Sequence, residues 1–157
     1  MKKIEIVIFS IFMVLLTGCQ NHEEQIMYEC SLWGNLEFYD TTYVTEIYSR
    51  DAKNISKLHI TTSYSAKWDD VDVKQLMTQL NQEKEEIYKS YEEVSYEIHQ
   101  IGNNITAEQI ISMTTNNLNM LKKDQNYQNL INHNQLNMEQ YVNWLTSQGY
   151  QCQNKNS

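Results

Sequence analysis

The segment ISKLHITTSY, residues 55–64, decides the expected fold because its side chains alternate in character. One face of an extended chain would carry the more apolar side chains, Leu58, Ile60, Thr62 and Tyr64. The other face would carry the more polar ones, Lys57, His59, Thr61 and Ser63. Alternation of this period is typical of a strand with one buried face and one solvated face. We therefore expect an antiparallel sheet that buries one side.

Strand-like sequence also precedes this segment. Residues 28–33 (YECSLW) and 36–49 (LEFYDTTYVTEIYS) are rich in Tyr, Thr, Val and Ile, which suit a pleated surface. Residues 50–54 (RDAKN) predict the turn that leads into residues 55–64. Together these segments predict a meander of consecutive strands.

Strand-like sequence returns further along the chain. Residues 93–101 (EVSYEIHQI) alternate, and the Gly-Asn-Asn that follows is a hairpin signal. Residues 105–115 fit either a strand that pairs back across this turn or a helix capped by Thr106 and Gln109. The turn and the repeated Ile and Thr favour the strand.

A helix is predicted over residues 71–91, where apolar residues recur at helical spacing. The apolar stripe consists of Val73, Leu76, Met77, Leu80, Ile87 and Tyr91. Asp69, Asp70 and Asp72 stand at its start, where carboxylates cap free amides and suit the helix dipole. The same carboxylates are the best metal candidate, but the glycine that a calcium loop requires is missing, so we interpret them as caps.

A second helix is predicted within residues 136–152, with Asn137 and Gln140 at its start and Gly149 at its end. Residues 116–135 are polar and Asn-rich and predict one short helical turn around residues 118–121. The expected fold class is α+β, with an antiparallel sheet of about five strands and two amphipathic helices packed on one face.

The N-terminus has the features of an export signal. A basic start, Met1-Lys2-Lys3, precedes an apolar run over residues 6–16, which is too short to span a bilayer. The sequence Leu16-Thr17-Gly18-Cys19 then resembles the lipobox of bacterial lipoproteins. An ordinary signal peptide, or a buried N-terminal helix, is the alternative interpretation.

The lipobox resemblance implies that the Cys19 thiol receives a diacylglyceryl group after cleavage. The predicted organisation is a signal peptide at 1–18, a lipidated tether at 19–26 and a single domain at 27–157. The lipid would hold this domain on the extracytoplasmic face of the cell membrane, since two acyl chains anchor a protein durably.

Cys30 and Cys152 remain in the expected domain, without a C-x-x-C motif and without a histidine at metal spacing. Outside the cytoplasm such a pair predicts a disulfide, and two unpaired buried thiols are the alternative. A bridge over so long a loop would contribute roughly 4–5 kcal/mol in the chain-entropy model.

The formal net charge of −8 makes nucleic acid an unfavourable partner, because phosphates would be repelled. The chain contains no nucleophile-elbow, phosphate-loop or zinc-protease motif. His59 and His99 fall on polar strand faces and could be neighbours across the sheet, but we interpret them as exposed strand residues. We therefore expect no catalytic residues, no metal and no cofactor.

Tyrosine is the enriched residue type that could bind a ligand. Tyr39, Tyr43, Tyr64 and Tyr96 all fall on expected strands. An exposed row of them could stack on sugars or grip a peptide. The alternative, which we prefer, is that they pack the sheet.

The order of elements carries a second resemblance. The lipobox, Tyr28-Glu29-Cys30, the meander, the SYSAKWDD segment (63–70) before a helix, the VSYEIHQIGNNIT hairpin (94–106) and a late helix are together similar to YehR-like small bacterial lipoproteins. The resemblance implies an α+β fold and an uncharacterised role, and it supplies no catalytic residue. The Asn-rich residues 116–135 depart from a compact version of that plan.

These observations favour a non-catalytic binding or accessory domain, with a protein, peptide or cell-envelope polymer as partner. The alternative is an inhibitor or immunity-type lipoprotein that blocks a lytic enzyme or toxin, since many such targets are basic. An enzyme is the least favoured class.

Intact mass spectrometry of the protein extracted from membranes tests the anchor. The expected mass is that of a chain beginning at Cys19 plus a diacylglyceryl group, because the signal peptide would be cleaved off immediately N-terminal to the lipidated cysteine. An unlipidated chain that still begins at Met1 would refute the predicted compartment.

Overall fold

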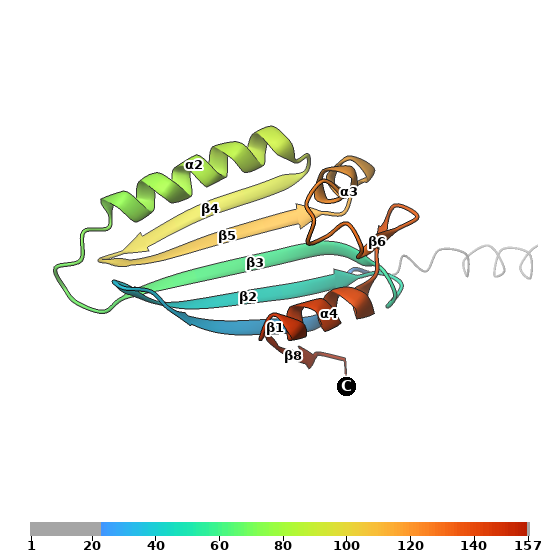
Figure 1. The fold of residues 1–157 in the computed structure, drawn as a ribbon, viewed down its shortest axis with the longest axis horizontal. Coiled ribbons are helices and arrows are strands. Elements are labelled where there is room, and N and C mark those ends of the chain that lie inside the picture. Colours follow the sequence, from blue (N-terminus) through green and yellow to red (C-terminus); the bar gives the residue numbers. More distant parts are fainter. Residues whose placement is uncertain (1–22, 157) are drawn as a thin grey trace, which may run out of the picture.

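The computed structural model describes residues 23–156. The predicted signal peptide and the lipidation site Cys19 lie outside the described residues. The α+β class is confirmed, since helices and an antiparallel sheet make up the described chain (Figure 1).

The main sheet of the described chain has six strands, one more than expected, in the order β4-β5-β3-β2-β1-β8. All neighbouring strands are antiparallel. Their bounds are β1 Gln25–Asn35, β2 Tyr39–Ser49, β3 Ile55–Ala66, β4 Val94–Ile101, β5 Asn104–Ser112 and β8 Gln151–Asn154. Residues 105–115 are therefore mostly strand, as the turn chemistry predicted. Gly102 adopts a φ of +61° in the two-residue turn between β4 and β5.

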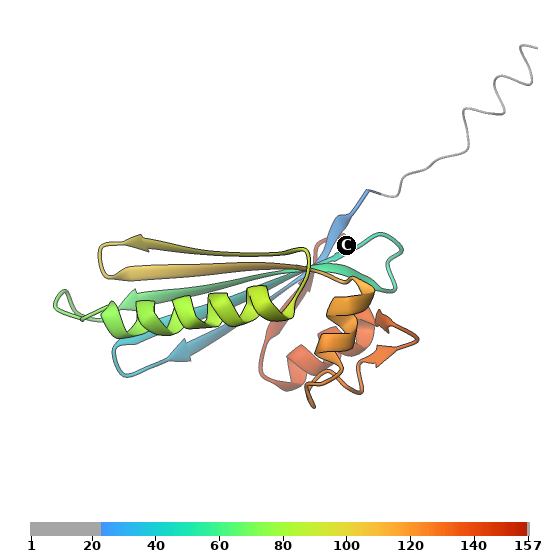
Figure 2. The same ribbon diagram turned by 90° about the horizontal axis from the view of Figure 1, so that it is seen from above.

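One face of this sheet is covered, as the alternation in residues 55–64 predicted. The helices α2 (Lys74–Ser90), α3 (Thr115–Leu121) and α4 (Met138–Ser147) lie on the same side of the sheet (Figure 2). A small hairpin of β6 (Ile131–Asn132) and β7 (Gln135–Leu136) lies beside α3 and α4. The described chain thus has three helices rather than the two expected.

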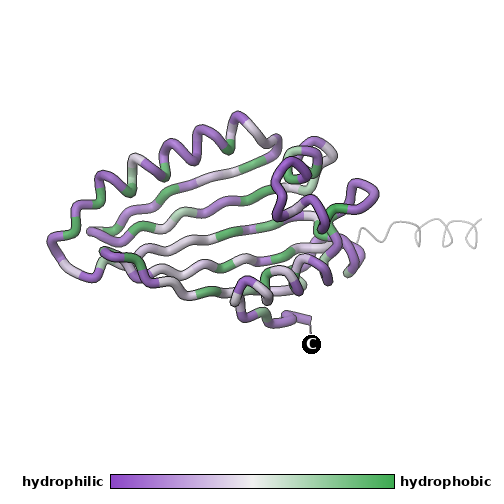
Figure 3. Tube along the Cα trace, in the orientation of Figure 1, coloured by the Kyte–Doolittle hydropathy of each residue, from purple (hydrophilic) through white to green (hydrophobic). Residues whose placement is uncertain are grey.

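The core between the sheet and these elements has two parts. Under α2, Leu80 packs with Tyr96, Ile105 and Ala107 from β4 and β5. Towards the other end of the strands, a larger cluster joins β1, β2 and β3 to α3, α4 and the small hairpin, and its buried members include Cys30, Ile47, Leu58, Leu118, Leu136, Tyr141 and Leu145. Figure 3 shows α2 as largely hydrophilic with separate hydrophobic positions, as expected for a helix that buries one narrow stripe.

The exposed edge of the sheet at β4 is partly protected by α2. The backbone N–H of Tyr96 donates to the hydroxyl oxygen of Tyr88 at 3.1 Å, and that hydroxyl donates to the Tyr96 carbonyl at 3.3 Å. Pairing of the edge backbone with a side chain removes groups that a foreign strand would otherwise use. The other edge strand, β8, is only four residues long.

The predicted disulfide is confirmed. Cys30 and Cys152 are bonded, and they are also direct partners in the β1–β8 ladder, with a Cα–Cα distance of 4.0 Å. The bond therefore fixes the last strand against the first described strand, on the covered face of the sheet.

The predicted ends of α4 are also confirmed. The Asn137 side chain accepts a hydrogen bond from the Gln140 N–H at 3.0 Å. After the helix, Gly149 has a φ of +94°, and the N–H groups of Gly149 and Tyr150 donate to the Thr146 and Leu145 carbonyls. This is the Schellman arrangement, which a glycine at this position permits.

The beginning of α2 differs from the prediction. The helix starts at Lys74 rather than at residue 71, and Asp72 accepts a hydrogen bond from the Lys74 N–H at 3.0 Å. The carboxylate closes the turn before the helix and thereby satisfies one of its free amides. Asp69 and Asp70 consequently lie in the preceding loop rather than in a cap.

The Asn-rich segment is more ordered than its composition suggested. His133 and Asn134 form the two-residue turn of the β6–β7 hairpin, with φ values of +50° and +56°. Asn and His are among the residues that adopt this left-handed conformation most readily, and it is the conformation of a type I′ turn.

Buried Asn117 connects α3 to the sheet. Its side-chain oxygen accepts from the Glu92 N–H at 2.8 Å, and its amide donates to the carbonyls of Glu92 and Ser112. The residue is fully buried. A single side chain therefore satisfies backbone groups at the start of β4 and the end of β5.

We expect Asn117→Ala to lower the free energy of unfolding by about 2–4 kcal/mol, because it leaves several backbone groups without partners. Urea unfolding monitored by circular dichroism measures this change. The exposed neighbour Asn116→Ala serves as the matched control and should change stability by less than about 0.5 kcal/mol. Equal effects of the two substitutions would contradict the role given to Asn117.

Candidate functional site

The tyrosines proposed as a binding row lie on the covered face of the sheet. Tyr39 and Tyr96 are buried, while Tyr43 and Tyr64 are half-buried. The Tyr39 and Tyr64 rings meet edge to face at 6.1 Å, and burial raises the pKa of Tyr64 and of Tyr96. These contacts make Tyr39 and Tyr96 part of the core, and a ligand role for the four tyrosines stays a prediction.

The two ends of the strands differ in what surrounds them. We call the end where β1 begins the proximal end, and the opposite end the distal end. The distal end consists of the turn at residues 36–38, the loop at 67–73 and the turn at 102–103. These connections lie together because β1, β3 and β4 run in the same direction and all end there (Figure 1).

Hydrogen bonds tie the distal connections together. The Lys67 N–H donates to the Phe38 carbonyl at 3.1 Å, and the Ala66 N–H donates to the Asn104 side chain at 2.9 Å. The Asn103 side chain donates to the Asp69 carbonyl. The three connections are therefore held as one surface.

This surface exposes large apolar side chains. Leu36, Phe38 and Trp68 are 46%, 50% and 54% exposed, and Ile101 at the neighbouring turn is 81% exposed. Single exposed apolar residues are common, but a group of them on one end of a small domain is typical of an interaction site. Trp33 is also exposed, but it lies on the uncovered face of β1.

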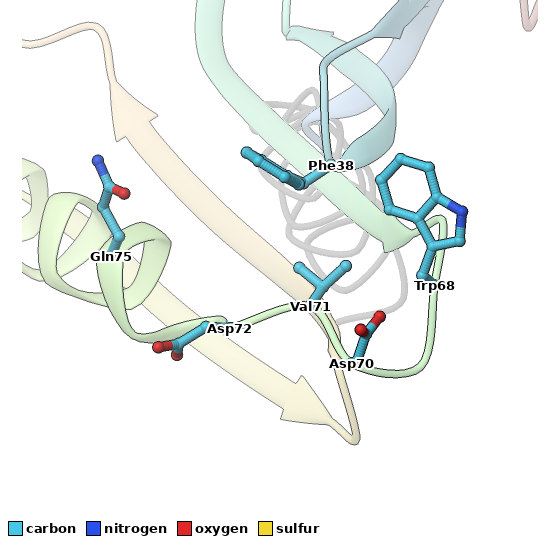
Figure 4. Close-up of a pocket in the computed structure, with 6 residues that line it drawn as sticks. All are labelled: Phe38, Trp68, Asp70, Val71, Asp72 and Gln75. Atoms are coloured by element: carbon cyan, nitrogen blue, oxygen red, sulfur yellow. The ribbon is translucent and has the colours of Figure 1, made fainter.

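A hollow of about 520 Å³ lies among these side chains. Phe38, Trp68 and Val71 supply its apolar wall, and Asp70, Asp72 and Gln75 supply its polar groups (Figure 4). The Phe38 and Trp68 rings are 6.4 Å apart with an interplanar angle of 73°. Apolar walls with a few polar groups are the usual composition of a ligand site.

The sequence did not single out Phe38 or Trp68, although it marked the aspartates beside them. Phe38 fell within a segment predicted as strand and Trp68 fell between the predicted meander and the predicted helix, so the available signal was only the presence of large aromatic residues near the ends of expected elements. The Asp69–Asp72 segment was interpreted as a helix cap, but the N-cap residue is Val73, and of these carboxylates only Asp72 accepts a hydrogen bond from the start of the helix.

The uncovered face of the sheet carries His59 and His99. His59 Nδ1 lies 2.9 Å from Glu46, and its Nε2 lies 3.8 Å from Glu108. His59 pairs with Ile110 and His99 pairs with Thr106, so β5 separates the two strands and the histidines are not neighbours, contrary to the expectation. Residues 23–156 contain no group of three or more side chains arranged to hold a metal ion.

These features define a small α+β domain with a one-sided antiparallel sheet and an apolar, acidic site at one end. Its fold is similar to the NMR structure of the E. coli YehR protein, with a TM-score of 0.56 and 10% sequence identity, over 85% of this chain and 94% of that one. This likeness fits the YehR-like plan expected from the order of elements, and it concerns the fold alone. No protein-family model and no curated protein matches the chain.

Among the described residues, no helix is long and apolar enough to cross a membrane.

If the distal side chains serve binding rather than folding, their removal should leave stability almost unchanged. We expect Phe38→Ala and Trp68→Ala each to lower the free energy of unfolding by less than about 1 kcal/mol, since both rings are half exposed. Urea unfolding measures this. The buried Leu58→Ala is the comparison and should cost about 2–5 kcal/mol. A loss of similar size at Trp68 would show that the distal end is core.

Proposed function

We propose that this chain is a lipid-anchored extracytoplasmic protein whose domain is a non-catalytic binding or accessory module. The observation that carries the proposal is the group of exposed apolar residues at the distal end: Phe38 and Trp68 line the distal hollow, and Leu36 lines a smaller hollow beside it. Water-exposed apolar surface of this kind gains free energy when a partner covers it. A protein, a peptide or a cell-envelope polymer could supply that cover.

The position of the proposed anchor supports the same proposal. With Cys19 lipidated, five residues would separate it from the start of β1 at Gln25. Because five extended residues span about 17 Å, the proximal end of the domain would stay near the membrane. The distal end, at the other end of strands eight to twelve residues long, would then face away from it.

A second candidate is an inhibitor or immunity-type lipoprotein that blocks a lytic enzyme or toxin. Asp70 and Asp72 beside the exposed rings favour it, because an acidic apolar patch complements a basic target. The two candidates share the distal end as the contact surface and differ in the consequence of binding.

Site-specific photo-crosslinking in living cells tests the proposal. A photoreactive amino acid at position 38 or 68 should yield crosslinked products of higher mass, because these positions would contact the partner. The same label at the exposed Ala52, in the turn between β2 and β3 at the proximal end, is the matched control and should yield none of these products.

If labels at positions 52 and 38 gave the same crosslinked products, the distal end would not be the specific contact surface. Absence of any crosslink from positions 38 and 68, with the protein present in membranes, would refute the binding role. Sensitivity of a deletion strain to a panel of lytic agents separates the candidates, because only an inhibitor predicts increased sensitivity.

A further inference from the structure

We propose that the distal hollow receives an arginine side chain from a basic partner protein, an inference that rests on the proposed function. The Phe38 and Trp68 rings and the Asp70 carboxylate would contact the guanidinium group. The inference goes beyond the proposed function because it names the chemistry of the partner.

The charge around the hollow is the first argument. Glu37, Asp40, Asp69, Asp70 and Asp72 lie in or beside the distal connections, against Lys67 and Lys74. The Lys67 ammonium is held by the Asn35 side chain and the Leu36 carbonyl and lies 3.8 Å from the Asp40 carboxylate, so these two charges offset each other. The surface therefore retains an excess of negative charge, which complements a cation and repels an acidic partner.

Asp70 is the carboxylate best placed to use this charge. It lines the hollow beside Trp68, and within residues 23–156 no hydrogen bond or ion pair engages its side chain (Figure 4). Asp72, by contrast, accepts the Lys74 N–H. A free carboxylate next to an aromatic ring is the usual arrangement for binding a cationic side chain, since the ring face and the carboxylate both attract positive charge.

The geometry of the rings is the second argument. Phe38 and Trp68 are inclined at 73° and form a corner rather than a coplanar platform. A saccharide would gain most from a flat platform, whereas a compact planar cation can lie on one ring face within reach of a carboxylate. This geometry favours guanidinium over a sugar.

The test uses the full-length protein in detergent micelles, with its tryptophan indoles labelled by ¹⁵N. The chain has three tryptophans, and the Trp68→Phe variant identifies the signal of Trp68. The probe is the synthetic peptide Gly-Ser-Arg-Gly-Ser-Arg-Gly-Ser. Two further peptides carry lysine or citrulline in place of arginine, and citrulline keeps the shape but not the charge.

We expect the arginine peptide to shift the Trp68 indole signal in a saturable manner and to leave the Trp144 signal unchanged. The lysine peptide should bind more weakly, and the citrulline peptide about tenfold more weakly, because citrulline loses both the ring and the carboxylate attraction. Asp70→Asn should weaken arginine-peptide binding about threefold and Trp68→Ala about fivefold. For Trp68→Ala, the Kd is measured by calorimetry.

Matched controls lie on the uncovered face. Trp33→Ala removes a tryptophan that is even more exposed than Trp68, and Glu97→Gln removes an exposed carboxylate on β4. Neither should change the Kd. Equal binding of the arginine and citrulline peptides, or a Trp68 shift with chito-oligosaccharide and none with the arginine peptide, would overturn the inference. Crosslinks from position 38 to a partner in cells would still support the proposed function in that case, so the two failures are distinguishable.

Discussion

Burial of one face of β3 is the constraint on which the rest of the molecule depends. Leu58 and Tyr64 lie on the same face of this strand but in different parts of the core, so β3 connects the two. The helices and the small hairpin therefore lie on that side of the sheet. The opposite face of β3 carries polar residues such as Lys57 and His59. The helix α2 covers the distal part of the strands and begins beside the distal connections, whereas α3, α4 and the small hairpin cover the proximal part.

The sequence predicted those features that depend on local chemistry. The alternation of residues 55–64, the Gly102 turn and both ends of α4 all follow from interactions between residues close in the chain, and the structure has them. The structure departs from prediction where distant residues meet. Asn117 reaches Glu92 across 25 positions, and the predicted Cys30–Cys152 bridge lies within a β1–β8 pairing that was not predicted. No pattern within residues 116–135 encodes such partners.

The candidate site was predicted less well than the fold, for a related physical reason. Tyr39, Tyr43, Tyr64 and Tyr96 were correctly expected on strands, but the side of the sheet that helices cover is decided by packing over the whole chain. Phe38 and Trp68 have no periodicity to mark them, since they stand beside turns and meet only when the β1–β2 turn and the β3–α2 loop are brought together. The distal site is formed by residues from separate turns and loops, so it can be recognised only in the folded structure and not in the sequence of any one of these segments.

Separation of the proposed anchor from the distal site has an electrostatic consequence. A chain of net charge −8 is repelled by an anionic membrane surface, so attachment through a lipid near the proximal end would favour orientations with the acidic distal end in solution. The same carboxylates would attract a basic partner over roughly a Debye length, about 8 Å at physiological salt. The exposed rings act only at contact, where they exclude water from the carboxylate and strengthen its attraction for a cation. Charge would thus govern how quickly a partner arrives, and the Phe38–Trp68 corner would govern how long it stays.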